Sequence, residues 1–207
     1  SNAFYQGALT QQVLQDLNEA GSKITAKDLA QYDATLSAPL RSQYRGHDIF
    51  SAGPLTAGPS LIQALKTFER MHPAPAESPD APAYLAMAKA LQATYADRLE
   101  NLGEGNLSGS TTHICTADSA GNLVSFTQTI MSAFGARILL PNSGILMNNG
   151  MMWFDPRPGG SNSVEGGRKP LCNMCPTLGR RQNGHWFAIG ACGGRKIFPS
   201  VFQLAIF

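Results

Sequence analysis

The stretch from Gly105 to Thr129 contains the residues best suited to nucleophilic chemistry. A Gly- and Ser-rich linker leads into a Thr-Thr-His run that begins at Thr111, and a further threonine ends the stretch. A threonine hydroxyl is a weak nucleophile and needs a base beside it. Cleavage of the bond after Ser110 would supply that base, because a free α-amino group has a pKa of about 7.7–8.0. Thr111 is therefore a candidate N-terminal nucleophile, and the alternative is an ordinary threonine in a strand.

The same stretch predicts a β-hairpin whose turn fixes its register. If Asp118–Asn122 is a five-residue turn, Thr111 lies opposite Thr129 and His113 lies opposite Thr127. Side chains alternate between the two faces of a strand, and a bulge would change this pairing. One face of the hairpin is then lined by Thr111, His113, Cys115, Ser125, Thr127 and Thr129.

The elements around the hairpin are helical before it and largely extended after it. They are predicted from the spacing of apolar residues, from capping residues, and from Gly and Pro at turns and helix ends. Helices are expected over 10–21, 26–32, 58–71 and 83–103, a first hairpin around Gly46, and a last strand over 185–191. We expect Tyr95, Asp97 and Arg98 to tie the longest helix to its neighbours.

Composition excludes several classes of function. The 207 residues are 43% hydrophobic and 14% charged, with a formal net charge of +2. Without a dense basic run, nothing indicates nucleic acid or a membrane surface as a partner, and no apolar window has transmembrane length. Residues 1–3 have the composition of a scar left by tag removal.

Two of the four cysteines, Cys172 and Cys175, have CxxC spacing. This spacing is typical of a zinc half-site or a redox pair. No second ligand pair is suitably spaced, so we interpret both as small buried residues and expect no metal.

The order of short motifs along the chain resembles the γ-glutamyltransferase (γ-glutamyltranspeptidase) family of N-terminal-nucleophile hydrolases. Before Thr111, the similar motifs are "FYQG", "ITAKDLAQY", "PLRSQYRG" and "YADR". From Thr111 onward, they are "TTH", "DSAGN", "TQT", "FG", "GILMNN", "GRKPLCNMCPT" and "GACGG". Each motif is short, and the resemblance rests on their collinear succession.

The resemblance implies an α+β fold, the αββα four-layer sandwich of N-terminal-nucleophile hydrolases. It also implies a precursor that cleaves itself between Ser110 and Thr111 without a cofactor. Residues 1–110 would be the C-terminal part of the large-subunit region and 111–207 the N-terminal part of the small-subunit region. The chain would then be a central fragment. The family resemblance suggests a periplasmic or secreted protein, with the signal region absent from this chain.

The resemblance also implies roles for individual residues. Thr111 would attack an amide carbonyl, form an acyl-enzyme and pass the acyl group to water or an amine. Thr129 matches the family's second threonine, which holds the nucleophile and its amine. Gly193 and Gly194 match the pair whose backbone N–H groups form the oxyanion hole. Considered alone, "CGG" indicates only a strand-to-helix turn.

The chain departs from the family pattern where the γ-glutamyl group would bind. A typical transpeptidase has an Asn, an Asp and a Ser–Ser pair where this chain has Met131, Trp153 and then Cys172 with Asn173. Asn173 can still donate and accept hydrogen bonds. Met131 and Trp153 cannot replace an amide and a carboxylate in holding a zwitterion.

The expected function is hydrolysis or transfer of γ-glutamyl groups from glutathione-like amides. The stretch "MMWFDPRPGG" is similar instead to the acylase-like branch of the family, for which the acyl group would be glutaryl or another acyl chain. Arg157 or Arg168 would then meet the substrate carboxylate. A non-catalytic homologue, an inert fragment and a CxxC thiol-redox protein remain as further alternatives.

Overall fold

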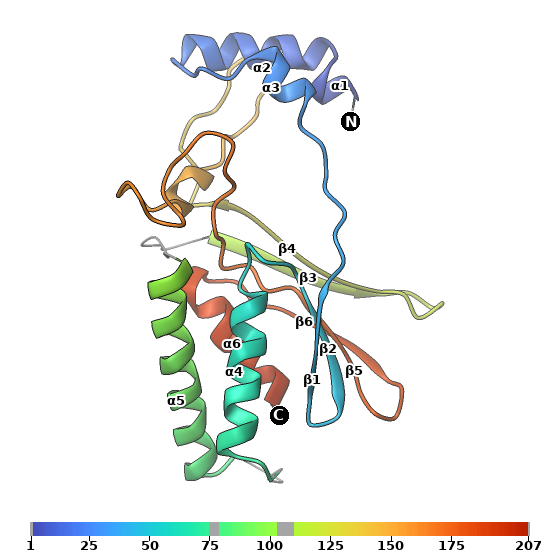
Figure 1. Ribbon diagram of the computed structural model, residues 1–207. Coiled ribbons are helices and arrows are strands. Elements are labelled where there is room, and N and C mark those ends of the chain that lie inside the picture. The colour runs from blue at the N-terminus through green and yellow to red at the C-terminus, as the bar shows by residue number, and fades with distance from the viewer. Residues whose placement is uncertain (1, 75–78, 103–109, 207) are drawn as a thin grey trace.

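The computed structural model describes residues 2–74, 79–102 and 110–206, and it shows an α+β fold (Figure 1). Three helices pack against one face of a four-stranded antiparallel sheet, and a long two-stranded hairpin crosses the sheet. The helices are α4 (Gly58–Met71), α5 (Ala81–Asp97) and α6 (Ile197–Ile206). The sheet has the order β1 (Leu40–Tyr44), β2 (His47–Ser51), β5 (Thr177–Arg180), β6 (Trp186–Ile189), and the hairpin is β3 (Ser110–Ala117) with β4 (Leu123–Met131).

Local sequence explains where the main helices begin. Pro59 lies in the first turn of α4, where its missing N–H has no helical partner to lose. The carboxylate of Asp80 accepts a hydrogen bond of 2.8 Å from the backbone N–H of Ala83 and caps α5. α5 passes into a π-helical turn, Arg98–Leu102.

The core lies between the three helices and the sheet. Leucines and phenylalanines of α4 and α6 meet the inner face of β1 and β2, where Tyr44 and Ile49 are buried. Phe68 of α4 packs edge-on against Phe202 of α6 with ring centroids 5.9 Å apart. Burial of such side chains is the main favourable term that holds the helices on the sheet.

A small helical unit precedes the sheet. It contains α1 (Asn2–Tyr5), α2 (Ala8–Glu19) and α3 (Ala26–Ala30), drawn in blue at the top of Figure 1. The buried carboxylate of Asp16 accepts hydrogen bonds from the backbone N–H groups of Asn142 and Ser143 at 3.1 and 3.2 Å. This carboxylate therefore fastens α2 to the segment that follows β4.

The hairpin has the register expected from its turn. Thr111 pairs with Thr129 and His113 pairs with Thr127. The hydroxyl of Ser125 attaches the hairpin to the sheet, because it accepts from the N–H of Thr177 at 3.0 Å and donates to the carbonyl of Ile189 at 2.9 Å. The opposite face carries four exposed apolar side chains, Ile114, Val124, Phe126 and Ile130.

Most of the expected elements are present, with shifted ends. The Thr25–Asp28 capping box is confirmed, but its helix ends at Ala30 and not at Tyr32. The first hairpin turns through Arg45 and Gly46, both with positive φ. The last expected strand is shorter, Trp186–Ile189. The expected helix end at Gly103 and most of the linker before Ser110 lie outside the described residues.

We predict that Asp48 stabilises the sheet in a pH-dependent way. Its carboxylate accepts hydrogen bonds from Arg180 and Arg41, and these lower its pKa. A lowered pKa adds stability above the unfolded-state value of about 3.9, and this stability is lost as the pH falls through the folded-state pKa. In urea unfolding, Asp48→Asn should be less stable than the unchanged chain near neutral pH. The difference in free energy of unfolding between the two chains should shrink as the pH falls below about 4.

The exposed Asp33→Asn substitution is the matched control, for which we expect little change. A gap for Asp48→Asn that stays constant down to acidic pH would contradict the ion-pair account.

Candidate active site

The site is built where β3 begins and β4 ends. Thr111 and Thr129 are direct cross-strand partners, and both side chains are half-buried. Immediately before Thr111 the register shifts, so that Ser110 pairs with Met131 and Ile130 is the extra residue of β4. A bulge of this kind redirects nearby side chains, and bulges are frequent next to active sites.

The hydroxyl of Thr129 is held at the bulge by two backbone groups. It accepts a hydrogen bond of 2.8 Å from the N–H of Met131 and donates one of 2.6 Å to the carbonyl oxygen of Ser110. That carbonyl belongs to the peptide bond that joins Ser110 to Thr111. A donor on a carbonyl oxygen draws electron density from the carbon, so this bond is polarised toward attack.

Met131 owes its position to an unusual backbone conformation. Its φ is 78°, in the left-handed region that is costly for a residue with a side chain, and its side chain is 1% exposed. The neighbouring carbonyl of Ile130 accepts a hydrogen bond of 2.9 Å from the N–H of Asn149. This contact brings the 3-10 turn Gly150–Trp153 against the end of β4, and with it Trp153.

A buried arginine fixes the segment that contains Cys172 and Asn173. Arg98 is 1% exposed, and its guanidinium donates to the carbonyl of Cys172 at 2.9 Å and to Oδ1 of Asn173 at 3.0 Å. It also donates to the hydroxyl of Ser60 at 3.1 Å. Together with the Tyr95 hydroxyl, which donates to the carbonyl of Arg195, these contacts confirm the expected role for Tyr95 and Arg98, while that of Asp97 stays a prediction.

Asn173 has a free donor in a buried position. The residue is 5% exposed, and its Nδ2 has no hydrogen-bond partner among the described residues. A buried polar group without a partner costs free energy unless a ligand or water satisfies it. The amide of Asn173 is therefore available to an acceptor atom, while its oxygen is already held by Arg98.

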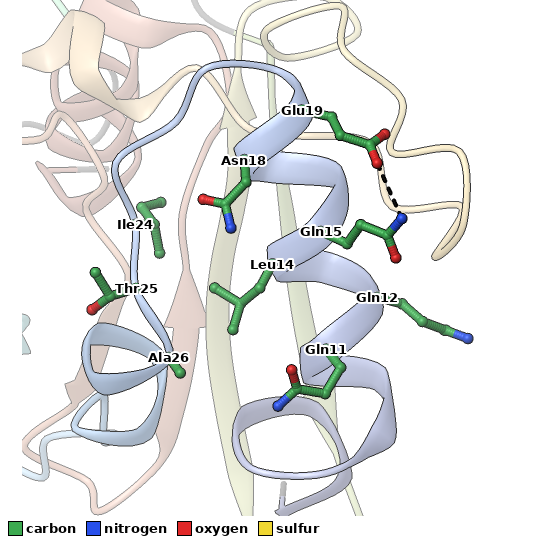
Figure 2. Close-up of a pocket in the computed structure, with 9 residues that line it drawn as sticks. All are labelled: Gln11, Gln12, Leu14, Gln15, Asn18, Glu19, Ile24, Thr25 and Ala26. Atoms are coloured by element: carbon green, nitrogen blue, oxygen red, sulfur yellow. Dashed lines mark hydrogen bonds between the residues drawn. The ribbon is translucent and has the colours of Figure 1, made fainter.

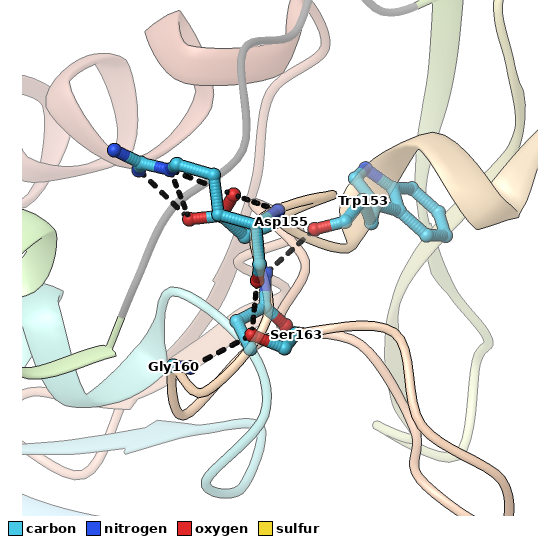
Figure 3. A network of polar contacts seen from close by, with 6 residues as sticks. Trp153, Asp155, Gly160 and Ser163 are labelled. Atoms are coloured by element: carbon cyan, nitrogen blue, oxygen red, sulfur yellow. Dashed lines mark hydrogen bonds and ion pairs between the residues drawn. The ribbon is translucent and has the colours of Figure 1, made fainter.

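The loop after Trp153 is ordered by its own polar network (Figure 3). The amide of Asn162 donates to the carbonyl of Trp153 at 2.7 Å, and Arg157 pairs with Asp155 at 2.8 Å. Arg168 forms an ion pair with Glu165. Both arginines that were candidates for a substrate carboxylate thus already contact carboxylates of this chain.

Gly193 and Gly194 lie in a separate segment between β6 and α6. Their φ values are 111° and 59°, a conformation that glycine adopts at little cost. They open a 3-10 turn, Gly194–Lys196, that leads directly into α6, so the expected strand-to-helix turn is present. The contact between Tyr95 and the carbonyl of Arg195 connects this turn to α5.

The cysteines are all free thiols. Cys172 and Cys175 are buried, and burial raises the pKa of Cys172 and raises that of Cys175 to about 11. A raised pKa disfavours the thiolate that redox exchange requires. In the described parts of the chain, no three His, Cys, Asp or Glu side chains are grouped so that they could hold a metal ion.

An open groove of about 720 Å³ lies along α2 (Figure 2). Its walls include the amides of Gln11, Gln12, Gln15 and Asn18, and Gln15 donates to the carboxylate of Glu19 at 3.0 Å. It contains none of the site residues expected from the sequence. The candidate site is therefore the hairpin end and not this groove.

Comparison with known proteins identifies the family. The gamma-glutamyltranspeptidase family model matches residues 1–108 and 104–206, and the chain belongs to this family. It is 29% identical to the glutathione hydrolase proenzyme of Escherichia coli (strain K12), over 98% of this chain and 44% of the relative. It is equally 29% identical to the acylase ACY 1 proenzyme of Pseudomonas sp. (strain SE83), over 99% of this chain and 44% of the relative.

The fold is similar to that of a solved relative. The crystal structure of cephalosporin acylase from Bacillus halodurans matches 99% of this chain and 44% of its own chain, with a TM-score of 0.88 at 22% identity. The chain thus spans less than half the length of the relatives that it matches. Among the described residues, no helix is long and apolar enough to cross a membrane.

The Arg98 contacts give a stability prediction. Arg98→Met removes the donor from buried acceptors on Ser60, Cys172 and Asn173, and should lower the free energy of unfolding by about 3 kcal/mol. Urea unfolding followed by circular dichroism measures the change. The exposed Arg70→Met on α4 is the matched control, and an equal loss in the two variants would contradict the role of Arg98.

Proposed function

We propose that this chain carries the nucleophile region of a self-processing N-terminal-threonine amidohydrolase or acyltransferase. The observation that supports it best is the Thr129 hydroxyl, which donates to the Ser110 carbonyl while Thr129 pairs with Thr111. The bond to be cut joins Ser110 to Thr111, which is also the proposed nucleophile. Thr129, the cross-strand partner of Thr111, supplies the donor for the charge that develops on the Ser110 carbonyl oxygen.

The processing step moves the acyl group of Ser110 from nitrogen to oxygen. The Thr111 hydroxyl attacks the Ser110 carbonyl carbon, the C–N bond breaks, and the hydroxyl proton ends on the Thr111 nitrogen. Thr129 stabilises the negative charge that develops on the Ser110 oxygen. Water then hydrolyses the ester, which leaves a carboxylate on Ser110 and a free amine on Thr111.

The freed terminus then performs turnover. The α-amine of Thr111 serves as the base for its own hydroxyl, since its pKa is about 7.7–8.0. The hydroxyl attacks a substrate amide and forms an acyl-enzyme, which water or an amine resolves. Gly193 and Gly194, whose positive φ values glycine adopts at little cost, are the proposed oxyanion donors. The chemistry needs no metal or organic cofactor.

The proposed cleavage divides the chain into a large-subunit part, residues 1–110, and a small-subunit part, residues 111–207. The two parts share one sheet, because β2 pairs with β5, so they would stay together after cleavage. In the proposed αββα sandwich, the helices, the four-stranded sheet and the hairpin would be three of the layers. In the complete precursor, a fourth, helical layer would cover the exposed Ile114, Val124 and Phe126.

Self-cleavage gives a direct prediction. In the complete precursor, Thr111→Ala should abolish cleavage, since no hydroxyl remains to attack. Thr129→Val should slow it about 100-fold, the usual effect of losing one oxyanion donor. Gel electrophoresis of time points measures the rates. Thr112→Val, on the opposite face of β3, is the matched control and should cleave normally. Normal cleavage by Thr129→Val would contradict the proposed role.

The first candidate for the acyl group is γ-glutamyl, as in glutathione-like amides, because the chain belongs to the gamma-glutamyltranspeptidase family. Asn173, with its free buried donor, would meet an acceptor atom of this group, and Cys172 would border it. The second candidate is a glutaryl or other acyl group. It is favoured by Met131 and Trp153, which offer no carboxylate for an α-ammonium group.

Substrate preference separates the two candidates. With the processed complete enzyme, a higher kcat/KM for a γ-glutamyl anilide supports the first candidate, and a higher value for a glutaryl anilide supports the second. Trp153→Asp should raise the ratio of γ-glutamyl to glutaryl turnover by about tenfold, because a carboxylate can pair with the ammonium group. Trp186→Asp, on β6, is the control, and an unchanged ratio in Trp153→Asp would exclude contact with the acyl group.

A further inference from the structure

A nucleophile, a base and an orienting group lie together on the polar face of the hairpin, apart from the threonine pair. The Nε2 atom of His113 is 3.2 Å from the sulfur of Cys115, and its Nδ1 atom is 2.7 Å from the hydroxyl oxygen of Thr127. His113 and Thr127 are direct cross-strand partners. Cys115 is exposed, so its sulfur is accessible to a reagent in solution.

The four-stranded sheet, against which the hairpin packs, fixes the imidazole ring of His113 in this position. The ring of His113 lies on the backbone of Gly190, and a Cβ atom at Gly190 would stand 1.9 Å from its Cε1 atom. Only glycine leaves room for the ring here, directly after β6. Partial burial lowers the pKa of His113, so the ring is neutral at pH 7 and one of its nitrogens is a proton acceptor.

We propose that Cys115 is a thiol–disulfide exchange site, activated by His113 and oriented by Thr127, that reacts with small-molecule disulfides. In this arrangement Nδ1–H of His113 donates to the Thr127 hydroxyl and Nε2 accepts the thiol proton. A nucleophile in reach of a base that a third group orients is the usual arrangement of an activated side chain. The proposal does not depend on the chemistry of Thr111.

The exchange is balanced in atoms and electrons. The Cys115 thiol gives its proton to Nε2 of His113, and the sulfur attacks one sulfur of the disulfide. The disulfide S–S bond breaks as the new S–S bond forms, and the departing thiolate recovers the proton from His113. Cys115 ends as a mixed disulfide, and one molecule of small thiol is released.

The chain contains its own comparison thiols. Cys192 is also an exposed free thiol, but it lies in the turn after β6 and not on the hairpin. Cys172 and Cys175 are buried, and their raised pKa values disfavour the thiolate. All four can therefore be followed in one sample, with Cys192 as the reference for simple exposure.

The experiment treats the folded 207-residue chain with glutathione disulfide at pH 7 and follows each cysteine by peptide mass spectrometry. Cys115 should form the mixed disulfide at least about tenfold faster than Cys192, since a positioned base accelerates proton transfer. Equal rates, or a faster Cys192, would overturn the proposal without any variant being needed.

Variants then test whether His113 causes the difference in rate between Cys115 and Cys192. His113→Gln should reduce the Cys115 rate to about that of Cys192, and Thr127→Val should reduce it in part, while the Cys192 rate stays unchanged in both. His185→Gln, at an exposed turn, is the control. Circular dichroism and the Cys192 rate report whether each variant is folded. A folded His113→Gln chain whose Cys115 keeps its full rate would overturn the role of His113.

Discussion

The hydroxyl of Thr129 joins the two strands of the hairpin at the one point where their pairing changes. It accepts a hydrogen bond from the N–H of Met131 and donates one to the carbonyl oxygen of Ser110. Both contacts lie at the bulge, where the register shifts between Ser110 and Thr111. The positive φ of Met131 is the strain that this geometry stores. Everything proposed for the nucleophile depends on this local distortion.

The rest of the structure holds the distorted hairpin end in place. Ser125 binds the far part of the hairpin to the backbone of β5 and β6, and Asn149 binds the carbonyl of Ile130 next to the bulge. Arg98 holds the segment of Cys172 and Asn173 through hydrogen bonds to the Cys172 carbonyl and the Asn173 Oδ1 atom. These contacts join segments far apart in the sequence, so the site depends on the complete fold of the chain.

Sequence predicted the local features and missed the long-range ones. The pairing of Thr111 with Thr129 followed from strand alternation and turn length, and the helix starts followed from Thr25 and Pro59. The bulge could not be predicted, because the residue types in this stretch do not indicate that Met131 has a positive φ. The Arg98 contacts to Cys172 and Asn173 cross 74 and 75 residues, a separation that no pattern encodes. The identity of the acyl group could not be predicted from sequence either. Met131 and Trp153 indicate only that the amide and the carboxylate of a typical transpeptidase are absent at these two positions.

The most direct test of the central claim is the intact mass of the complete precursor after incubation, with N-terminal sequencing of its pieces. Two polypeptides that remain associated are expected, of which the N-terminal one ends at Ser110 and the C-terminal one begins Thr-Thr-His. A folded precursor that stays uncut, or one cut at any other bond, would contradict the assignment of Thr111 as the nucleophile.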